Sequence, residues 1–250
     1  MNTQVRISAK NLGELAMPNF CPRCFWLKLK LNNKLPYQIF PGIFSSIDSY
    51  TKQIVHGHFD CNSCFPQWLD GLGELAGYRE PPHYSKFKIV DETSGVTLWG
   101  TPDGVFMKSD GSYVIVDYKT AKYTGTQDKL MPMYQVQLNA YAMIGEMCGI
   151  VKPVSDLALI YMEPVTHRDA AIDVSNYRDG GFAMEFTANI HRIELNTSVI
   201  PGLLAKTREI YELSQAPSSR DGCKECLLLD AMVDVVNRSG ILEFRELADE

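Results

Sequence analysis

The residues best suited to chemistry in this 250-residue sequence are Asp103, Asp117 and Lys119, within the stretch Trp99–Tyr141. Asp110-Gly111 is a strong turn signal between two segments of strand-like composition, which predicts a β-hairpin. Side chains at positions i and i+2 of a strand point to the same face. Asp117 and Lys119 are therefore expected to project together, with Asp103 level with them on the partner strand.

Two carboxylates and a lysine in one place suit metal-assisted phosphodiester hydrolysis. Neighbouring carboxylates repel each other unless a cation lies between them, and their oxygen atoms are suitable ligands for Mg²⁺ or Mn²⁺. We expect Asp103 and Asp117, helped by the Tyr118 carbonyl, to hold that ion. Lys119 is expected to orient a water molecule or hold a phosphate oxygen. The alternative for an isolated D-x-K pattern is a surface hairpin with a solvated ion pair.

Three motifs follow one another in the order found in a known family. They are G-x-x-D at Gly100–Asp103, D-x-K at Asp117–Lys119 and Q-x-x-x-Y at Gln137–Tyr141. This pattern resembles the PD-(D/E)xK nucleases, and most of all the RecB-like branch that includes the CRISPR-associated exonucleases. The resemblance implies an α/β fold of the restriction-endonuclease type, with a mixed central sheet flanked by helices. It also implies a catalytic set of Asp103, Asp117, Lys119, Gln137 and Tyr141.

The segments around the motifs have the patterns that such a fold needs. A helix over Met133–Cys148 would place Gln137 and Tyr141 on one face, because they are four residues apart. A buried strand over Leu157–Met162 would follow this helix and run parallel to the D-x-K strand. A further hairpin within Phe87–Gly100 is expected to begin the sheet as an antiparallel meander. Without the motifs, a buried Tyr141 beside an exposed Gln137 would be the simpler interpretation.

Six of the seven cysteines form three C-x-x-C pairs. In a reducing compartment, repeated pairs of this kind indicate metal or redox chemistry before structural disulfides. One pair supplies two thiolates, so two pairs are needed for a zinc or 4Fe–4S site. We expect Cys21, Cys24, Cys223 and Cys226 to form one centre that joins the two ends of the chain. The competing pair, Cys61 and Cys64, lies in a segment that we interpret as a loop, and Cys148 is expected to be a buried thiol.

The RecB-like plan that the cysteines resemble commonly has one early and three late cysteines, whereas this chain has two at each end. The identity of the bound metal, zinc or iron–sulfur, therefore stays open. A further ligand to the catalytic metal is expected from a helix that begins near Ser45 or Ser46 and continues through Val55. In the resembled family this helix supplies a histidine or a glutamate. The candidates here, which the sequence does not rank, are Asp48, His56 and His58.

A basic strip without intervening acidic residues begins within the first cysteine pair, at Arg23, in a segment expected to be helical after Ser8. Arg23 and Lys28 of this strip, and Lys122 beyond the D-x-K motif, are candidate contacts to DNA phosphates. The alternative for the lysines is a solvated helix face. The formal net charge of −6 is not that of a protein that coats nucleic acid along its whole surface.

The length suits one RecB-like nuclease domain over residues 1–250, with a core at about 40–195 and terminal segments that form a metal-bound lobe. The N-terminal segment lacks the apolar core of a signal peptide, and we expect a cytoplasmic protein. The predicted function is metal-dependent DNA hydrolysis, as an exonuclease on single-stranded ends, with partners in a repair or CRISPR adaptation complex. The alternative is a non-catalytic nucleic-acid-binding or assembly module on the same fold. A redox or metal-storage protein would leave the aspartates of the hairpin unexplained.

Overall fold

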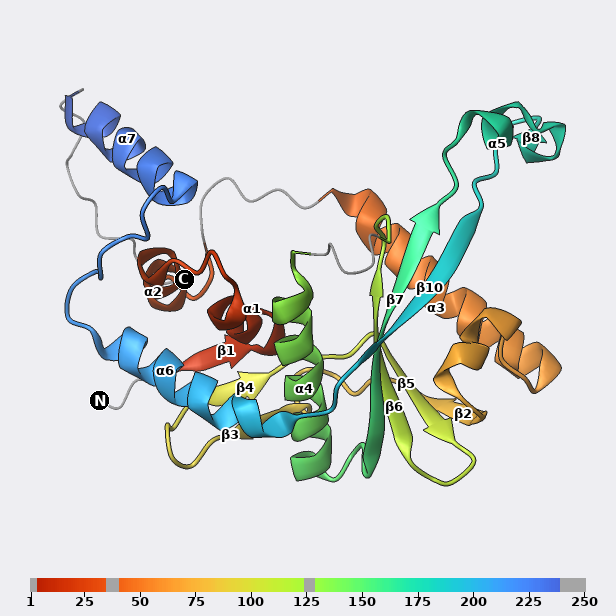
Figure 1. Cartoon of the computed structure of the whole chain (residues 1–250), viewed down its shortest axis with the longest axis horizontal. Helices are drawn as coiled ribbons and strands as arrows, with labels where there is room; N and C mark the ends of the chain where they lie inside the picture. Colours follow the sequence, from red (N-terminus) through yellow and green to blue (C-terminus); the bar gives the residue numbers. More distant parts are fainter. Residues whose placement is uncertain (1–3, 35–40, 124–128, 239–250) are drawn as a thin grey trace.

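The structure is a computed structural model that describes residues 4–34, 41–123 and 129–238 (Figure 1). Its strands are β1 (Arg6–Ser8), β2 (Leu75–Arg79), β3 (Lys88–Val90), β4 (Thr97–Trp99), β5 (Gly104–Lys108), β6 (Tyr113–Lys119), β7 (Val154–Pro164), β8 (Tyr177–Arg178), β9 (Gly181–Phe182) and β10 (Phe186–Ile193). Its α-helices are α1 (Ala9–Gly13), α2 (Pro22–Lys30), α3 (Gly42–Asn62), α4 (Met131–Cys148), α5 (Arg168–Ile172), α6 (Ile200–Glu212) and α7 (Lys224–Arg238). Short 3₁₀ helices are η1 (Glu14–Ala16), η2 (Gln67–Leu72), η4 (Val174–Asn176) and η5 (Thr197–Val199).

The central sheet has five strands in the order β10-β7-β6-β5-β2. β6 and β7 are parallel, and the other neighbouring pairs are antiparallel. The parallel pair is joined through α4, as predicted from the buried strand that follows this helix. The turn at Asp110-Gly111 closes the β5–β6 hairpin, with Gly111 at a φ of +82° that suits glycine. The predicted mixed sheet flanked by helices is therefore confirmed.

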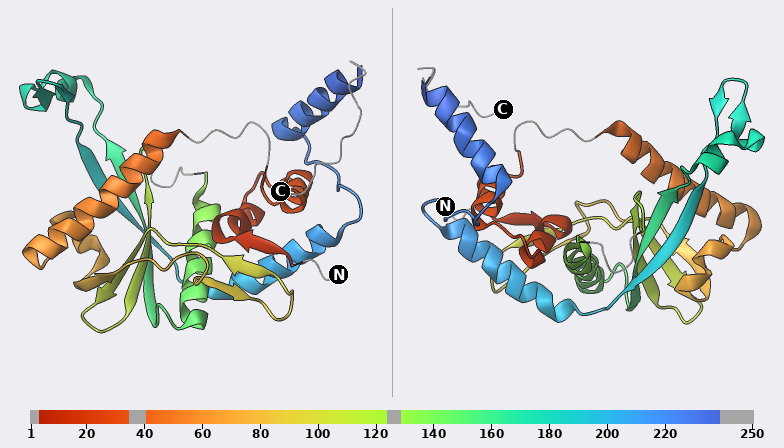
Figure 2. Two further views of the ribbon diagram at one scale, coloured as in Figure 1. Left: turned by 180° about the vertical axis from the view of Figure 1, so that it is seen from behind. Right: turned by 45° about the horizontal axis from the view of Figure 1, so that its top comes forward.

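Strand β6 is buried on both faces, and its side chains alternate between two hydrophobic clusters. Val114, Val116 and Tyr118 pack with Val55 of α3 on one face. Ile115 packs on the other face, in the cluster that contains α4. Helices α4 and α3 thus cover opposite faces of the sheet (Figure 2). The odd-numbered positions of β6 consequently face α4.

The hairpin predicted within Phe87–Gly100 forms, because β3 and β4 pair antiparallel. The prediction that this hairpin begins the central sheet is wrong. β4 instead pairs with β1 in parallel, from Arg6 opposite Thr97, and the order β1-β4-β3 makes a separate three-stranded sheet. The N-terminal strand takes this place because its Ile7 packs into the larger hydrophobic cluster.

Two of the predicted helices have different bounds. The helix expected after Ser8 does begin there, since the Ser8 hydroxyl caps α1, but it ends early, and α2 begins only at Pro22. Pro18 and Pro22 explain the interruption, because proline disrupts a helix interior. Helix α3 starts at Gly42, before Ser45, and runs to Asn62, so Cys61 lies in its last turn and not in a loop.

β7 and β10 extend beyond the other strands and carry a small lobe made of α5, β8 and β9 (Figure 1). At the other side of the molecule, α2, α6 and α7 form a helical group that brings early and late segments of the chain together. The domain boundaries stay a prediction, and the expected core limit at residue 40 lies outside the described residues. None of the described helices is long and apolar enough to cross a membrane.

Candidate active site and cysteine centre

The β5–β6 hairpin brings Asp103 and Asp117 together. Gly104 pairs with Val116, so Asp103, one residue earlier, lies level with Asp117 on the neighbouring strand. The backbone N–H of Tyr118 donates a 2.9 Å hydrogen bond to Asp103 Oδ2, which fixes this carboxylate against the end of β6.

Asp117 is the buried carboxylate of the site, with 4% of its surface exposed. Gln137 Nε2 of α4 donates a 2.9 Å hydrogen bond to Asp117 Oδ1 and lies 3.0 Å from the Tyr141 hydroxyl. Lys119 forms an ion pair with Asp117, and its Nζ lies 4.3 Å from the centre of the Tyr134 ring. The structure thus brings together the five residues that the motifs singled out. An exposed Gln137 is excluded, because this side chain is buried.

Gly100, the first residue of the G-x-x-D motif, allows α4 to approach the hairpin closely. A Cβ atom at this position would lie 2.4 Å from the Tyr141 ring and 3.4 Å from the Ala9 Cβ. A larger residue would push Tyr141 aside and disturb its hydrogen bond with Gln137. The motif glycine therefore has a packing role in aligning the helix with the carboxylates.

Burial, and then the nearby charge of Asp103, raises the pKa of Asp117 to about 6. Asp117 Oδ2 faces the Lys119 ammonium in their ion pair, whereas the buried Gln137 Oε1 accepts no hydrogen bond from the described residues. Buried oxygen atoms without a donor are destabilising unless a cation or water satisfies them. The carboxylate oxygens of Asp103 and Asp117, which lie level on neighbouring strands, are of the type that binds a divalent cation such as Mg²⁺ or Mn²⁺. Tyr118 points its side chain to the opposite face of the sheet, as expected, and a metal-binding role of its carbonyl stays a prediction.

Among the three candidates on α3, Asp48 lies nearest to this site. Lys52, four residues later on the same helix, places its Nζ 2.8 Å from Asp48 Oδ2 and 2.8 Å from Asp103 Oδ1. Burial opposes the charge, but the carboxylates of Asp103 and Asp48 raise the pKa of Lys52, so it is an ammonium. Sequence reasoning missed Lys52. Its spacing of four from Asp48 indicates a helical ion pair, but the contact with Asp103 depends on the tertiary fold.

The two histidines of α3 are engaged elsewhere. His56 stacks on Tyr78 with ring centres 4.0 Å apart, and its Nδ1 lies 3.3 Å from Glu80. His58 Nδ1 lies 2.8 Å from the Cys64 carbonyl oxygen. Lys52 therefore links Asp48 to the site, whereas both histidines are engaged elsewhere, and the choice of the further metal ligand stays a prediction.

A second chemical centre lies in the helical group, where the ligand atoms of four cysteines are all within 4.8 Å of one another. The Sγ atoms are separated by 3.4 Å between Cys24 and Cys226, 3.5 Å between Cys24 and Cys223, and 3.7 Å between Cys21 and Cys226. This is the set predicted to join the two ends of the chain. Four thiolates so arranged can hold zinc or an iron–sulfur centre.

Each half of this centre is built at the start of a helix. Cys21 and Cys223 directly precede α2 and α7, and Cys24 and Cys226 lie in the first turns. Helix N-termini favour thiolates, which are the form that binds a metal. Burial opposes ionisation of Cys21, but hydrogen bonds led by the Arg220 N–H, 3.4 Å from its Sγ, lower the Cys21 pKa to about 6.

The other three cysteines lie outside this cluster. Cys61 and Cys64 are exposed and do not compete for a place in it. Cys148 is half-buried, less enclosed than predicted, and its thiol lies 3.2 Å from the Lys88 carbonyl oxygen.

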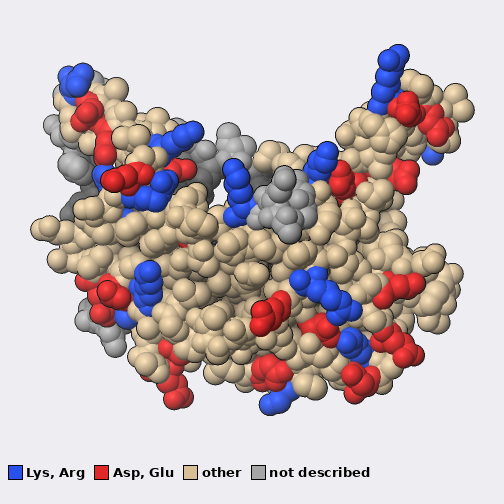
Figure 3. Space-filling view, in the orientation of Figure 1, with Lys and Arg blue, Asp and Glu red and all other residues tan. Residues whose placement is uncertain are grey.

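Two of the three predicted DNA contacts are paired with carboxylates that are distant in sequence. Arg23 makes two hydrogen bonds, of 2.6 and 2.9 Å, to Asp230 of α7, and Lys28 lies 2.8 Å from both oxygens of Glu14. Lys122 is exposed. On the face shown in Figure 3, basic and acidic side chains are interspersed and do not form one basic patch. Contacts of these three residues with DNA stay a prediction.

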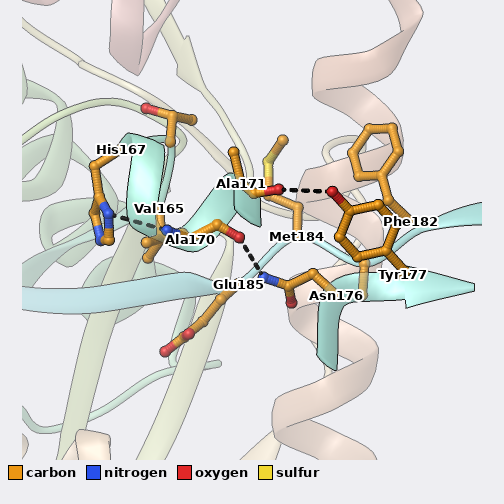
Figure 4. A pocket seen from close by; sticks show the side chains of 11 residues that line it. Val165, His167, Ala170, Ala171, Asn176, Tyr177, Phe182, Met184 and Glu185 are labelled. Atoms are coloured by element: carbon orange, nitrogen blue, oxygen red, sulfur yellow. Dashed lines mark hydrogen bonds between the residues drawn. The ribbon is translucent and has the colours of Figure 1, made fainter. Parts of the chain in front are cut away.

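A pocket of about 370 Å³ lies in the lobe that β7 and β10 carry, away from the carboxylates (Figure 4). Its walls include Tyr177, Phe182 and Met184. The one imidazole in its lining, His167, accepts a 3.2 Å hydrogen bond from the Ala170 N–H and so caps α5. We interpret this pocket as a feature of the lobe and not as the catalytic site.

The raised pKa of Asp117 predicts a pH-dependent gain in stability for Asp117→Asn. The folded-state pKa of about 6 exceeds the reference value of 3.8, so ionisation destabilises the fold as the pH rises between these values. Without added divalent cation, Asp117→Asn should raise the free energy of unfolding by about 3 kcal/mol at pH 8 and have little effect at pH 4. Urea unfolding at both pH values measures this difference.

Asp156 provides the matched control in the same sheet. Ion pairs with Lys108 and Arg192 lower its pKa despite partial burial, so Asp156→Asn should lower stability at pH 8. Equal effects of the two substitutions at pH 8 would contradict the account of Asp117.

Comparison with known proteins places this geometry in a family. Residues 63–230 match the PD-(D/E)XK nuclease superfamily. No match was found among curated proteins. Among solved structures, one titled SSO0001 is 13% identical with a TM-score of 0.38, covering 87% of this chain and 81% of that chain. An alkaline exonuclease from Laribacter hongkongensis is 8% identical with a TM-score of 0.40, covering 94% and 93%. The superfamily match spans well over half of the sequence, and on this match the chain belongs to the PD-(D/E)xK nuclease superfamily.

Proposed function

We propose that the protein is a metal-dependent deoxyribonuclease that hydrolyses phosphodiester bonds. The observation that carries this proposal is the convergence of Asp103, the buried Asp117 and Lys119 at the C-terminal end of β6, the middle strand of the central sheet. A buried carboxylate with a raised pKa is destabilising, and functional sites are where such groups concentrate. The superfamily membership supports the same reaction class.

The residues divide into two roles in this proposal. Asp103 and Asp117, with Asp48 and the Tyr118 carbonyl, hold Mg²⁺ or Mn²⁺, which would supply positive charge to the scissile phosphate as a Lewis acid. Lys119 orients the attacking water or stabilises the charge that develops on phosphate oxygens. Gln137 and Tyr141 position the Asp117 carboxylate through the hydrogen bonds described above.

The substrate and setting follow from the resemblance to the RecB-like branch. We propose DNA with free, single-stranded ends as the substrate and exonucleolytic cleavage as the mode. Arg23, Lys28 and Lys122 are proposed phosphate contacts, although the first two would have to share their charge with Asp230 and Glu14. A single domain over residues 1–250, cytoplasmic, with partners in a repair or CRISPR adaptation complex, completes the proposal.

For the cysteine centre we propose zinc in preference to an iron–sulfur cluster. Zinc–thiolate bonds of about 2.3 Å place tetrahedral sulfur atoms about 3.8 Å apart, close to the separations of 3.4–3.7 Å found here. In an iron–sulfur cluster the cysteines bind more than one iron atom, and the sulfide core keeps the thiolates further apart. The compact arrangement of the four Sγ atoms therefore supports a single ion.

Cleavage of end-labelled single-stranded DNA in Mg²⁺ or Mn²⁺ tests the catalytic proposal. Asp117→Ala should abolish cleavage and leave the fold intact, because the variant removes a proposed ligand together with a repulsion. Lys119→Ala should lower kcat by about a hundredfold or more, as for the loss of a transition-state donor, with a much smaller change in DNA affinity.

Asp156→Ala serves as the control, since this carboxylate lies in the same sheet but pairs with Lys108 and Arg192. It should retain cleavage if it remains folded. Full activity of Asp117→Ala would overturn the site assignment. DNA binding by the wild-type protein without cleavage in either metal would favour the non-catalytic module.

Metal analysis of protein purified without oxygen tests the zinc proposal. We expect one zinc per chain and no visible absorption. The double variants Cys21→Ala/Cys24→Ala and Cys223→Ala/Cys226→Ala should each lose the metal, because neither pair alone completes a four-coordinate site. Cys61→Ala/Cys64→Ala is the matched control and should retain it. Iron with inorganic sulfide, or a brown protein, would overturn zinc, and retention in either of the first two variants would overturn the shared centre.

A further inference from the structure

Lys52 is a charged residue of the described site that the motifs do not account for. Its Nζ lies 2.8 Å from Asp48 Oδ2 and 2.8 Å from Asp103 Oδ1, so one ammonium bridges α3 and the β5–β6 hairpin. The site as a whole contains three carboxylates and two lysines, because Asp117 and Lys119 form a second ion pair beside the one that Lys52 makes with Asp48 and Asp103. Lys52 thus supplies part of the positive charge that keeps these carboxylates together.

The oxygen atoms that Lys52 contacts belong to the proposed metal ligands. Asp103 Oδ2 already accepts the Tyr118 N–H, and Asp103 Oδ1 is the oxygen bound to Lys52. A divalent cation that shares this oxygen with an ammonium would be repelled by it, because like charges a few ångströms apart in a partly buried site interact strongly. Binding of the cation by Asp48 and Asp103 therefore requires Lys52 to move.

The two lysines of the site differ in their freedom to move. Lys119 is enclosed, at 17% side-chain exposure, between Asp117 and the Tyr134 ring. Lys52 is more exposed, at 28%, and its partner Asp48 is 38% exposed. A lysine is a compact charge on a flexible stem, so it can leave its partners for solvent without rearrangement of the backbone.

We propose that the Lys52 ammonium is an internal competitor of the divalent cation for Asp48 and Asp103. It stabilises the carboxylates of the metal-free protein and is displaced when the cation binds. The proposal rests on the metal site of the proposed function. Its consequence is a lowered apparent metal affinity, because the cation binds only the fraction of molecules in which Lys52 has left the carboxylates.

The test is Mn²⁺ binding by isothermal titration calorimetry in the absence of DNA. If Lys52 lies on the carboxylates in nine-tenths or more of the molecules, Lys52→Met should lower the Kd for Mn²⁺ by about tenfold or more. Methionine keeps the length of the apolar stem and removes the charge. The Mn²⁺-induced rise in melting temperature should also be larger in Lys52→Met than in the wild type, and this measurement checks that the variant is folded.

Lys108→Met is the matched control, because it removes the same charge from a lysine that pairs with Asp156, at 20% side-chain exposure. It should leave the Kd for Mn²⁺ unchanged. The triple combination of Lys52→Met with Asp48→Asn and Asp103→Asn should lose the gain in affinity. The proposed competition would be overturned if the Kd for Mn²⁺ in Lys52→Met were unchanged or higher than in the wild type, or if that variant did not bind Mn²⁺. The proposed nuclease function is tested separately, because full activity of Asp117→Ala in the cleavage assay would contradict that function and not the competition.

Discussion

The burial of the Asp117 carboxylate is the constraint on which the arrangement of the site depends. A carboxylate between a sheet and a helix needs donors or cations close by, and the chain supplies Gln137 from α4 and Lys119 from the same strand. The requirement fixes how α4 is rotated, since the face that carries Gln137 and Tyr141 must point at β6. Gly100 then provides the space in which this helix face can approach. Hairpin register, helix orientation and the motif glycine thus converge on one buried charge.

The cysteine centre stabilises the structure in a different way. Cys24 and Cys226 are 202 residues apart in sequence, yet their Sγ atoms are separated by 3.4 Å. Closing so long a loop restricts the unfolded chain, and a structural thiolate site adds its metal-binding free energy to folding. Arg23 and Asp230 pair beside it, which joins α2 to α7 a second time. Helix α2 also packs into the core through Phe25, whereas the buried residue of α7 is Cys226, so α7 is held largely by this centre.

Local patterns in the sequence were sufficient for the hairpin, the helix with Gln137 and the parallel strand that follows, because turn chemistry and periodicity determine them. Tertiary contacts determined the rest. β1 pairs with β4 across 91 positions, from Arg6 to Thr97, which no local signal indicates. Likewise, the strip containing Arg23 has no acidic residue nearby in sequence, yet its partner comes from α7. Lys52 could be read as a helical ion pair, but only the fold shows it on the carboxylates.

The most direct test of the account is a crystal structure of the protein soaked in Mn²⁺, with anomalous scattering used to locate the ion. The account predicts a peak at about 2.1 Å from oxygen atoms of both Asp103 and Asp117, with Asp117 still bonded to Gln137. A peak elsewhere, or its absence while Asp117 and Lys119 keep their ion pair, would contradict it.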